Sequence, residues 1–270
     1  MCPPFPPILG LISRALEDPG VNDRDVRRAL RADEALSLGL LRYANTAWMA
    51  QRRPARTIDQ ALAVVGMAGL RSIVLTQFIG AFFTQSGPVE ALLWEHSVAS
   101  AVATALQRSG GGPATEELYL CGLLHNAGKA ALNAEDRPRY ADVVARVIQT
   151  GEEFAQAEEV LLGVSHSSVG AELLREANVP PLVKHVTLHH HQPERAPAEA
   201  ADVCRMLLLA DAIAYRASPA WARLLGPAEP PRWIEGRLRQ PGQSPVAPDI
   251  DALEARVCAE LDRIRSWLGR

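Results

Sequence analysis

Residues 122–129 read GLLHNAGK, and this stretch places a histidine and an asparagine at the end of an apolar segment. Thr115 can cap a helix that runs through this segment into His125 and Asn126. Gly128 is where we expect that helix to end, because glycine commonly terminates helices. A histidine in such a position is either a hydrogen-bonded core residue or a ligand, and the stretch alone leaves both open.

Helical periodicity continues on both sides of this stretch, and no clean alternating strand pattern is present. Several signals mark helix ends: Asn22 and Asp33 as caps, Thr57 with Gln60 as a capping box, and Gly66 as a stop. We expect helices at about residues 8–16, 23–30, 33–44, 57–65, 68–83, 89–109, 115–127, 140–150, 153–162, 166–177, 181–190, 199–215 and 249–268. The sequence therefore predicts an all-α protein built as a multi-helix bundle.

Two segments rich in proline and glycine suggest the domain organisation. Residues 85–88 read QSGP and indicate a boundary, and residues 218–248 read as a loose connector. We expect an N-terminal helical subdomain at 1–85, a helical bundle at 86–217, and a connector with a final helix at 218–270.

Composition excludes several classes of protein. The chain has 270 residues, 48% of them apolar, and a net charge of −3 without the basic stripe of a nucleic-acid-binding domain. We see no signal peptide and no uninterrupted apolar run of about 18 residues, so we expect a cytoplasmic protein that does not enter a membrane. None of the four cysteines forms a CxxC pair, so neither a zinc knuckle nor a redox motif is predicted.

Seven histidines raise the alternative of a metal site. Imidazoles and carboxylates on neighbouring helices commonly hold divalent metals in helical bundles. Asp211 lies within an apolar helix-forming run and needs a partner, which a metal or a histidine proton would supply. Each histidine taken singly could equally be a core or surface residue. The histidines are His96, His125, His166, His185, His189, His190 and His191.

The order of these residues resembles the HD superfamily, in which a His, a His-Asp pair, further histidines and a final Asp hold one or two metals for phosphate-ester hydrolysis. The N-terminal half narrows the resemblance to the HDOD family. Residues 40–46, LLRYANT, are similar to its LLRxANS segment, and residues 57–75 are similar to its SIxxAIxxLG and LRxLVL segments. Glu158, Gly163 and His166 fit its ExxxxGxxH string. The resemblance covers about residues 5–215 and implies an N-terminal helical subdomain followed by an HD-like helical bundle.

Two departures from the HD pattern bear on activity. Asn126 stands where the HD pair has its Asp, and a neutral amide is a poorer ligand for a hard cation. The residues after His191 also lack the Gly-Tyr-Pro signature of the related HD-GYP enzymes. The resemblance therefore implies a non-catalytic signalling module of bacterial type, a pseudo-enzyme without a cofactor, that binds a protein or a small ligand.

The alternative is a metal-dependent HD-type phosphohydrolase. In that case His96, His125 and Asp211 would hold zinc, iron or manganese, and Lys129 would lie near a bound phosphate. Lys129 could instead be a helix-end lysine that faces water. If the resemblance holds, the pocket candidates gather in one place. They are His96, His125, Asn126, Lys129, His166, His190, His191 and Asp211.

The final helix carries a narrow apolar stripe that recurs every three or four residues. Such a helix is marginal alone in water and needs a partner surface. It either packs on its own bundle or pairs with a second chain as a homodimer. The stripe consists of Ile250, Leu253, Val257, Leu261, Ile264 and Leu268.

Overall fold

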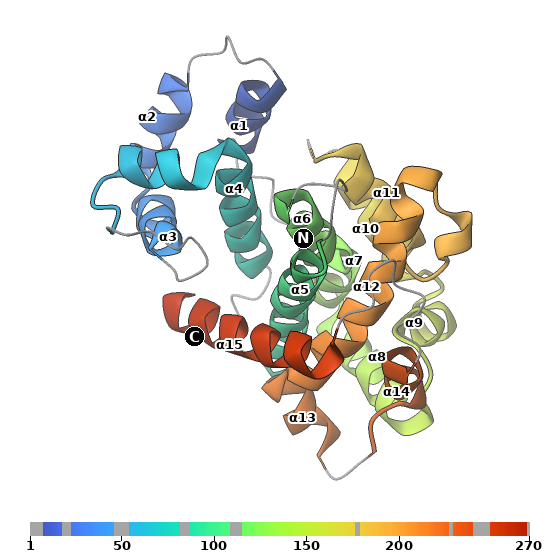
Figure 1. The fold of residues 1–270 in the computed structure, drawn as a ribbon. Coiled ribbons are helices and arrows are strands. Elements are labelled where there is room, and N and C mark those ends of the chain that lie inside the picture. Colours follow the sequence, from blue (N-terminus) through green and yellow to red (C-terminus); the bar gives the residue numbers. More distant parts are fainter. Residues whose placement is uncertain are drawn as a thin grey trace. The chain divides into compact units, whose positions relative to one another are not determined.

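The computed structural model describes residues 8–17, 23–45, 54–81, 87–108, 115–175, 179–226, 229–239 and 249–268. Throughout these ranges the regular elements are helices and no strand occurs, which confirms the predicted all-α class (Figure 1). The chain divides into two compact units, one of residues 1–3 and 79–261 and one of residues 4–78 and 262–270. The predicted three-part division with boundaries at 85 and 217 stays a prediction.

The smaller unit contains helices α1 (Ile8–Glu17), α2 (Arg24–Ala32), α3 (Glu34–Ala44) and most of α4 (Ile58–Ala81). Asp33 caps α3 by accepting a hydrogen bond from the Leu36 amide at 3.0 Å. The Asn45 side chain spans the loop after α3, since it bonds both the amide and the carbonyl of Ala55 at 2.6 and 2.9 Å. The predicted Asn22 cap lies outside the described residues.

Helix α4 begins and breaks where the sequence predicts. Thr57 accepts from the Gln60 amide at 3.2 Å, and Gly66 adopts φ 71°, which interrupts the helix. Residues Ile58–Gln77 are long and apolar enough to pass a length-and-composition test for a membrane span, although half of that window is buried. The break at Gly66 divides the segment into shorter pieces, so this is weak evidence for a span.

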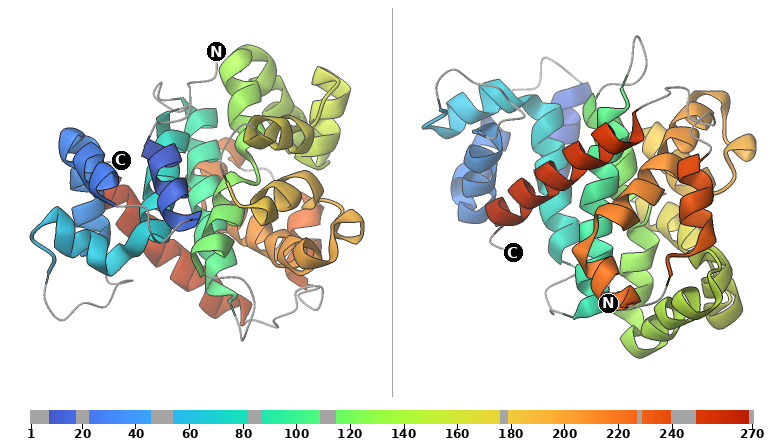
Figure 2. Two further views of the ribbon diagram at one scale, coloured as in Figure 1. Left: turned by 90° about the horizontal axis from the view of Figure 1, so that it is seen from above. Right: turned by 60° about the horizontal axis from the view of Figure 1, so that its bottom comes forward.

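The larger unit is built around α5 (Pro88–Leu106), a helix buried on nearly all sides. A helix that is apolar all round belongs in a core. Helices α6, α12 and α13 pack against α5, while α7 packs on α10 and α14 packs on α12. Both views of Figure 2 keep α12 alongside α5. The remaining elements of this unit are α6 (Thr115–Leu124), α7 (Ala127–Glu135), α8 (Arg137–Thr150), α9 (Phe154–Leu162), α10 (His166–Arg175), α11 (Pro181–His189), η2 (Pro193–Arg195), α12 (Ala198–Ala217), α13 (Pro219–Leu225), α14 (Arg232–Arg239) and the first part of α15 (Ile250–Leu268).

The GLLHNAGK stretch forms a tight turn between two helix crossings. A Cβ on Gly122 would lie 2.4 Å from the Ser100 carbonyl oxygen, and one on Gly128 would lie 2.0 Å from the His166 carbonyl oxygen. These glycines therefore let α6 approach α5 and α7 approach α10 closely. The expected helix end at Gly128 is wrong: α6 ends at Leu124, and Gly128 lies in the first turn of α7.

The expectation of a loose connector at 218–248 is also wrong for its described parts. Ser218 accepts from the Trp221 amide at 3.1 Å and caps α13, and α14 follows at Arg232. Trp221, Ile234 and Leu238 are buried, so both short helices belong to the core of the larger unit. Proline and glycine in this segment mark helix ends, which composition alone did not distinguish from a connector.

The first part of the final helix, up to Leu261, is held by its own chain within the larger unit. Leu253, Val257 and Leu261 of its apolar stripe are buried, and Arg216 of α12 forms an ion pair with Glu254. These three positions of the stripe are covered in a single chain. Pairing with a second chain stays a prediction.

Candidate functional site

The residues singled out in the sequence come from five places in the larger unit. His96 lies in the middle of α5, His125 and Asn126 lie in the turn between α6 and α7, and Asp211 lies in α12. His166 is the first residue of α10, and His190 and His191 follow α11. The structure brings their side chains together as two adjoining groups of possible metal ligands.

The first group, called here the Asp211 cluster, consists of His96, His125 and Asp211. Asp211 Oδ1 lies 3.0 Å from His96 Nε2 and 3.4 Å from His125 Nε2. His125 is oriented by the Gly122 carbonyl, which accepts from its Nδ1 at 2.8 Å. With its proton on Nδ1, the neutral His125 ring presents an Nε2 lone pair to the carboxylate. This contact therefore suits a cation or an additional proton between the two atoms.

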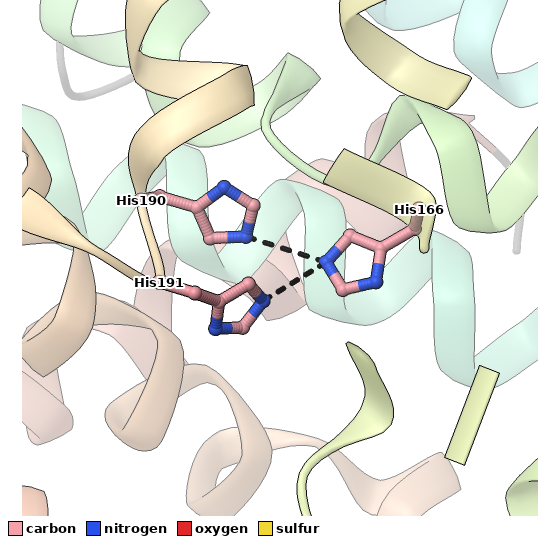
Figure 3. Close-up of side chains that lie close together, drawn as sticks. All are labelled: His166, His190 and His191. Atoms are coloured by element: carbon pink, nitrogen blue, oxygen red, sulfur yellow. Dashed lines mark hydrogen bonds between the residues drawn. The ribbon is translucent and has the colours of Figure 1, made fainter. Parts of the chain in front are cut away.

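The second group, called here the triple-histidine cluster, consists of His166, His190 and His191. Their Nε2 atoms converge: His166 Nε2 lies 3.3 Å from His190 Nε2 and 3.0 Å from His191 Nε2 (Figure 3). The Nδ1 atoms of His166 and His190 donate to Glu158 and to the Thr187 carbonyl, at 2.6 and 2.9 Å. In neutral rings this leaves both Nε2 atoms as acceptors that face each other, an arrangement suited to a cation.

The two clusters touch through one pair of rings. The centroids of His125 and His190 lie 4.9 Å apart, with the ring planes nearly perpendicular. The structure therefore gathers the predicted histidines and Asp211 in one region, although they come from five places in the sequence. Their role in binding stays a prediction.

Glu158 is the buried anchor of the triple-histidine cluster. Its Oε2 accepts from both the backbone amide and the Nδ1 of His166 at 2.6 Å, and its Oε1 accepts from the Tyr140 hydroxyl at 2.7 Å. Gly163, at φ 78°, ends α9 and turns the chain back toward Glu158. The ExxxxGxxH string is thus a carboxylate, a left-handed turn and the histidine that the carboxylate orients.

Arg237 is a member of the site that sequence reasoning missed. Its Nη1 donates to Asp211 Oδ2 at 2.6 Å, and its Nη2 donates to Glu153 Oε1 at 2.9 Å. Glu153 Oε2 in turn lies 3.2 Å from His191 Nδ1. Arg237 lies on α14, in the segment expected to be a connector, and no motif spacing joins it to Asp211. Recognising α14 as a helix would have been the only available signal.

Lys129 is buried, which rules out a water-facing helix end. Its Nζ donates to the Tyr215 hydroxyl at 3.2 Å and lies 4.2 Å from the centre of the Phe154 ring. No ion pair of Lys129 occurs within the described part of the chain. Burial lowers the pKa of Lys129, and the nearby charges of Asp211 and Glu158 oppose that shift.

Asn126 is buried beside His125, and neither its Nδ2 nor its Oδ1 has a hydrogen-bond partner among the described residues. An orphaned buried amide is costly, because each polar atom loses its water without replacement. The amide therefore offers two unpaired polar atoms beside His125, but it brings no negative charge to the site.

Burial and the two carboxylates set the protonation of the site. Burial lowers the pKa of His96 to about 4 and of His166 to about 3, although Asp211 and Glu158 respectively oppose the shift. Burial would raise the pKa of Asp211, but hydrogen bonds to His125 and His96 and the charge of Arg237 hold it well below its ordinary value. Near neutral pH the two histidines are therefore uncharged and Asp211 is a carboxylate.

The two clusters differ in how well they fit a metal. In each, one ligand atom per residue lies within 4.8 Å of the others. The triple-histidine cluster fits zinc or another borderline metal, since its donors are convergent imidazole nitrogens. In the Asp211 cluster, the carboxylate already bonds a protein cation through Oδ2. Bound at the triple-histidine cluster, a metal would supply a Lewis acid.

Comparisons with known proteins assign the chain to a protein family. The HDOD domain family matches residues 2–193. The chain belongs to the HDOD domain family. Among solved structures, an HDOD domain protein of unknown function from Geobacter sulfurreducens is 26% identical, with a TM-score of 0.69, over 97% of this chain and 93% of that one.

Two further likenesses agree with this placement. A structure from Shewanella amazonensis described as a putative phosphohydrolase is 22% identical over 98% of this chain and 94% of that one, with a TM-score of 0.70, which supports the fold. A curated protein of Treponema pallidum, described as uncharacterized, is 28% identical over 73% of this chain. The aligned part spans 39% of the length of that relative.

Proposed function

We propose that this HDOD chain is a non-catalytic regulatory module of bacterial signal transduction that acts in the cytoplasm by binding a protein or a small ligand. The observation that carries the proposal is the position of Asn126, a buried neutral amide beside His125 where the HD pattern has an anionic ligand. Hydrolysis by an HD site needs that carboxylate to hold a hard cation. The contact of Arg237 with Asp211 further reduces the negative charge available to metals.

Hydrolysis assays test this proposal directly. We expect no turnover of cyclic dinucleotides or of a simple phosphodiester with Mg²⁺, Mn²⁺ or Fe²⁺ added. Asn126→Asp restores the missing carboxylate and is the informative variant, because any activity it gains identifies the amide as the defect. Turnover by the unmodified protein that His125→Ala abolishes would overturn the proposal.

The second candidate is a metal-dependent HD-type phosphohydrolase with an atypical site. The convergent Nε2 atoms of His166, His190 and His191 favour it, because they fit a metal ion. Metal analysis of protein purified without a histidine tag separates the candidates when it is combined with the assay. Metal together with turnover supports the enzyme, whereas a lack of turnover with metal bound supports the regulatory module.

A further inference from the structure

Arg237 lies where a cation would neutralise the carboxylates of the site. Its two terminal nitrogens bond different acids, Asp211 Oδ2 at 2.6 Å and Glu153 Oε1 at 2.9 Å. One guanidinium thus joins the acid of the Asp211 cluster to the acid that lies beside His191. Only 15% of the Arg237 side chain is exposed, and only 6% of Asp211.

The arginine is fixed from its other side as well. Its guanidinium carbon lies 4.7 Å from the centre of the Trp233 ring, one helical turn earlier on α14. Ile234 and Leu238 of the same helix are buried, and α14 packs on α12, which carries Asp211. Because the packing of α14 and the Trp233 ring hold it in place, Arg237 has a fixed position in the site.

The charges around the Asp211 cluster disfavour the binding of a metal ion there. The described residues supply one carboxylate to this cluster, since Asn126 is neutral, and Arg237 already balances that carboxylate. A divalent ion bound through Oδ1 would face the guanidinium across a single carboxyl group, in a buried site where like charges repel strongly. The triple-histidine cluster lacks a direct Arg237 contact within the described part of the chain, and its Nε2 atoms converge on one another.

We propose that Arg237 acts as an internal cation that excludes metal from the Asp211 cluster, so that the site holds no more than one metal ion, at the triple-histidine cluster. This inference concerns the site on which the proposed function rests, but it predicts a metal count and not an activity. The count tests it whether or not the protein hydrolyses a phosphoester, so the two proposals fail separately.

The test counts zinc in untagged full-length protein that is loaded with excess Zn²⁺, desalted and analysed by mass spectrometry for metal. We expect Arg237→Met to bind about one zinc ion more per chain than the unmodified protein, because His96, His125 and Asp211 then form an open two-histidine, one-carboxylate set. Arg239→Met, on an exposed position of the same helix, is the matched control and should leave the count unchanged. Adding Asp211→Asn to Arg237→Met should remove the gained ion.

A second arm does not depend on the folding of the Arg237 variant. In the otherwise unmodified chain, His96→Gln should leave the zinc count unchanged, whereas His190→Gln should lower any zinc that is bound. Circular dichroism checks that each variant is folded. Two zinc ions in the unmodified protein, a loss of zinc in His96→Gln, or no gain in folded Arg237→Met would each overturn the inference.

Discussion

The two histidine clusters adjoin, yet their chemistry differs. The Asp211 cluster gathers one side chain each from α5, the α6–α7 turn and α12, and its acid is paired with an arginine. The triple-histidine cluster has imidazole nitrogens alone at its centre, and its acid, Glu158, stands behind His166 as an orienting partner. The negative charge of the Asp211 cluster is therefore balanced by a cation of the protein itself. The triple-histidine cluster instead presents imidazole nitrogen lone pairs that face one another.

The number of histidines in a region therefore does not define a metal site. What decides is whether the negative charge and the nitrogen lone pairs near them are already used. In this HDOD chain, Asp211 is satisfied by Arg237, and the opposing Nε2 atoms of His166 and His190 are not. Changes to the helix packing, to the acid that orients His166 and to the pH test this difference between the clusters.

Among the substitutions, the largest expected effect comes from separating α7 and α10. Gly128→Ala places a Cβ 2.0 Å from the His166 carbonyl oxygen and 2.7 Å from the Gly170 amide, both of which are backbone atoms. The helices must move apart, and His166 moves with α10. We expect the free energy of unfolding to fall by about 3 kcal/mol or more, measured by urea denaturation.

Gly236→Ala is the matched control for that substitution. Gly236 lies exposed on α14, and a Cβ there meets nothing within 4 Å. Alanine favours the helix over glycine, so we expect a gain of about 0.5–1 kcal/mol. Equal effects of the two substitutions would show that the α7–α10 crossing is less tight than the structure places it.

Helices with a strong apolar pattern and recognisable caps could be predicted from the sequence. Asp33, the Thr57–Gln60 pair and Gly66 act locally, within a few residues of the backbone that they cap or break. Helices α13 and α14 were missed, because short helices between prolines have too few residues to show a period. Their stability comes from buried contacts such as that of Trp221, which local sequence does not reveal.

The residues of the candidate site likewise divide into those that could be predicted from the sequence and those that could not. Its histidines, Asn126 and Asp211 could be picked out because their order resembles a known pattern. Arg237 could not, because its contact with Asp211 joins two helices 26 positions apart and follows from packing alone. The role of Gly128 was likewise hidden, since a glycine that permits close approach looks like a helix stop in the sequence.

A smaller effect is expected from loosening the acid that orients His166. Tyr140→Phe removes the hydroxyl that donates to Glu158 Oε1 at 2.7 Å in a fully buried place. A buried hydrogen bond to a charged group contributes about 1.5–3 kcal/mol, so we expect the free energy of unfolding to fall by that amount. Differential scanning calorimetry and chemical denaturation measure the loss.

Tyr215→Phe is the matching change beside the Asp211 cluster. Its ring centre lies 4.1 Å from that of His96, and its hydroxyl accepts from Lys129. The NMR signal of the His166 Nδ1 proton should move in Tyr140→Phe and stay in place in Tyr215→Phe. If both variants move that signal alike, Glu158 does not act on His166 separately from the rest of the site.

A further effect is expected in the pH dependence of stability in the presence of a chelator. The pKa of His96 is about 4 and that of His166 is about 3 in the folded chain, both below their ordinary value near 6.5. Between these values the unfolded chain binds a proton that the folded chain does not, so stability falls as the pH falls. Each histidine contributes a slope of about 1.4 kcal/mol per pH unit.

The contribution of each cluster to this slope should end at a different pH. The contribution of His96 is fully present above pH 6.5 and is lost by about pH 4, whereas that of His166 continues to be lost toward pH 3. Urea denaturation from pH 7 to pH 4 should therefore give a shallower slope in His96→Gln and in His166→Gln than in the unmodified chain. Below pH 4 only His166→Gln should still differ in slope. A slope that neither substitution changes would mean that these rings are not buried as neutral imidazoles, and the contrast between the clusters would then rest on Arg237 alone.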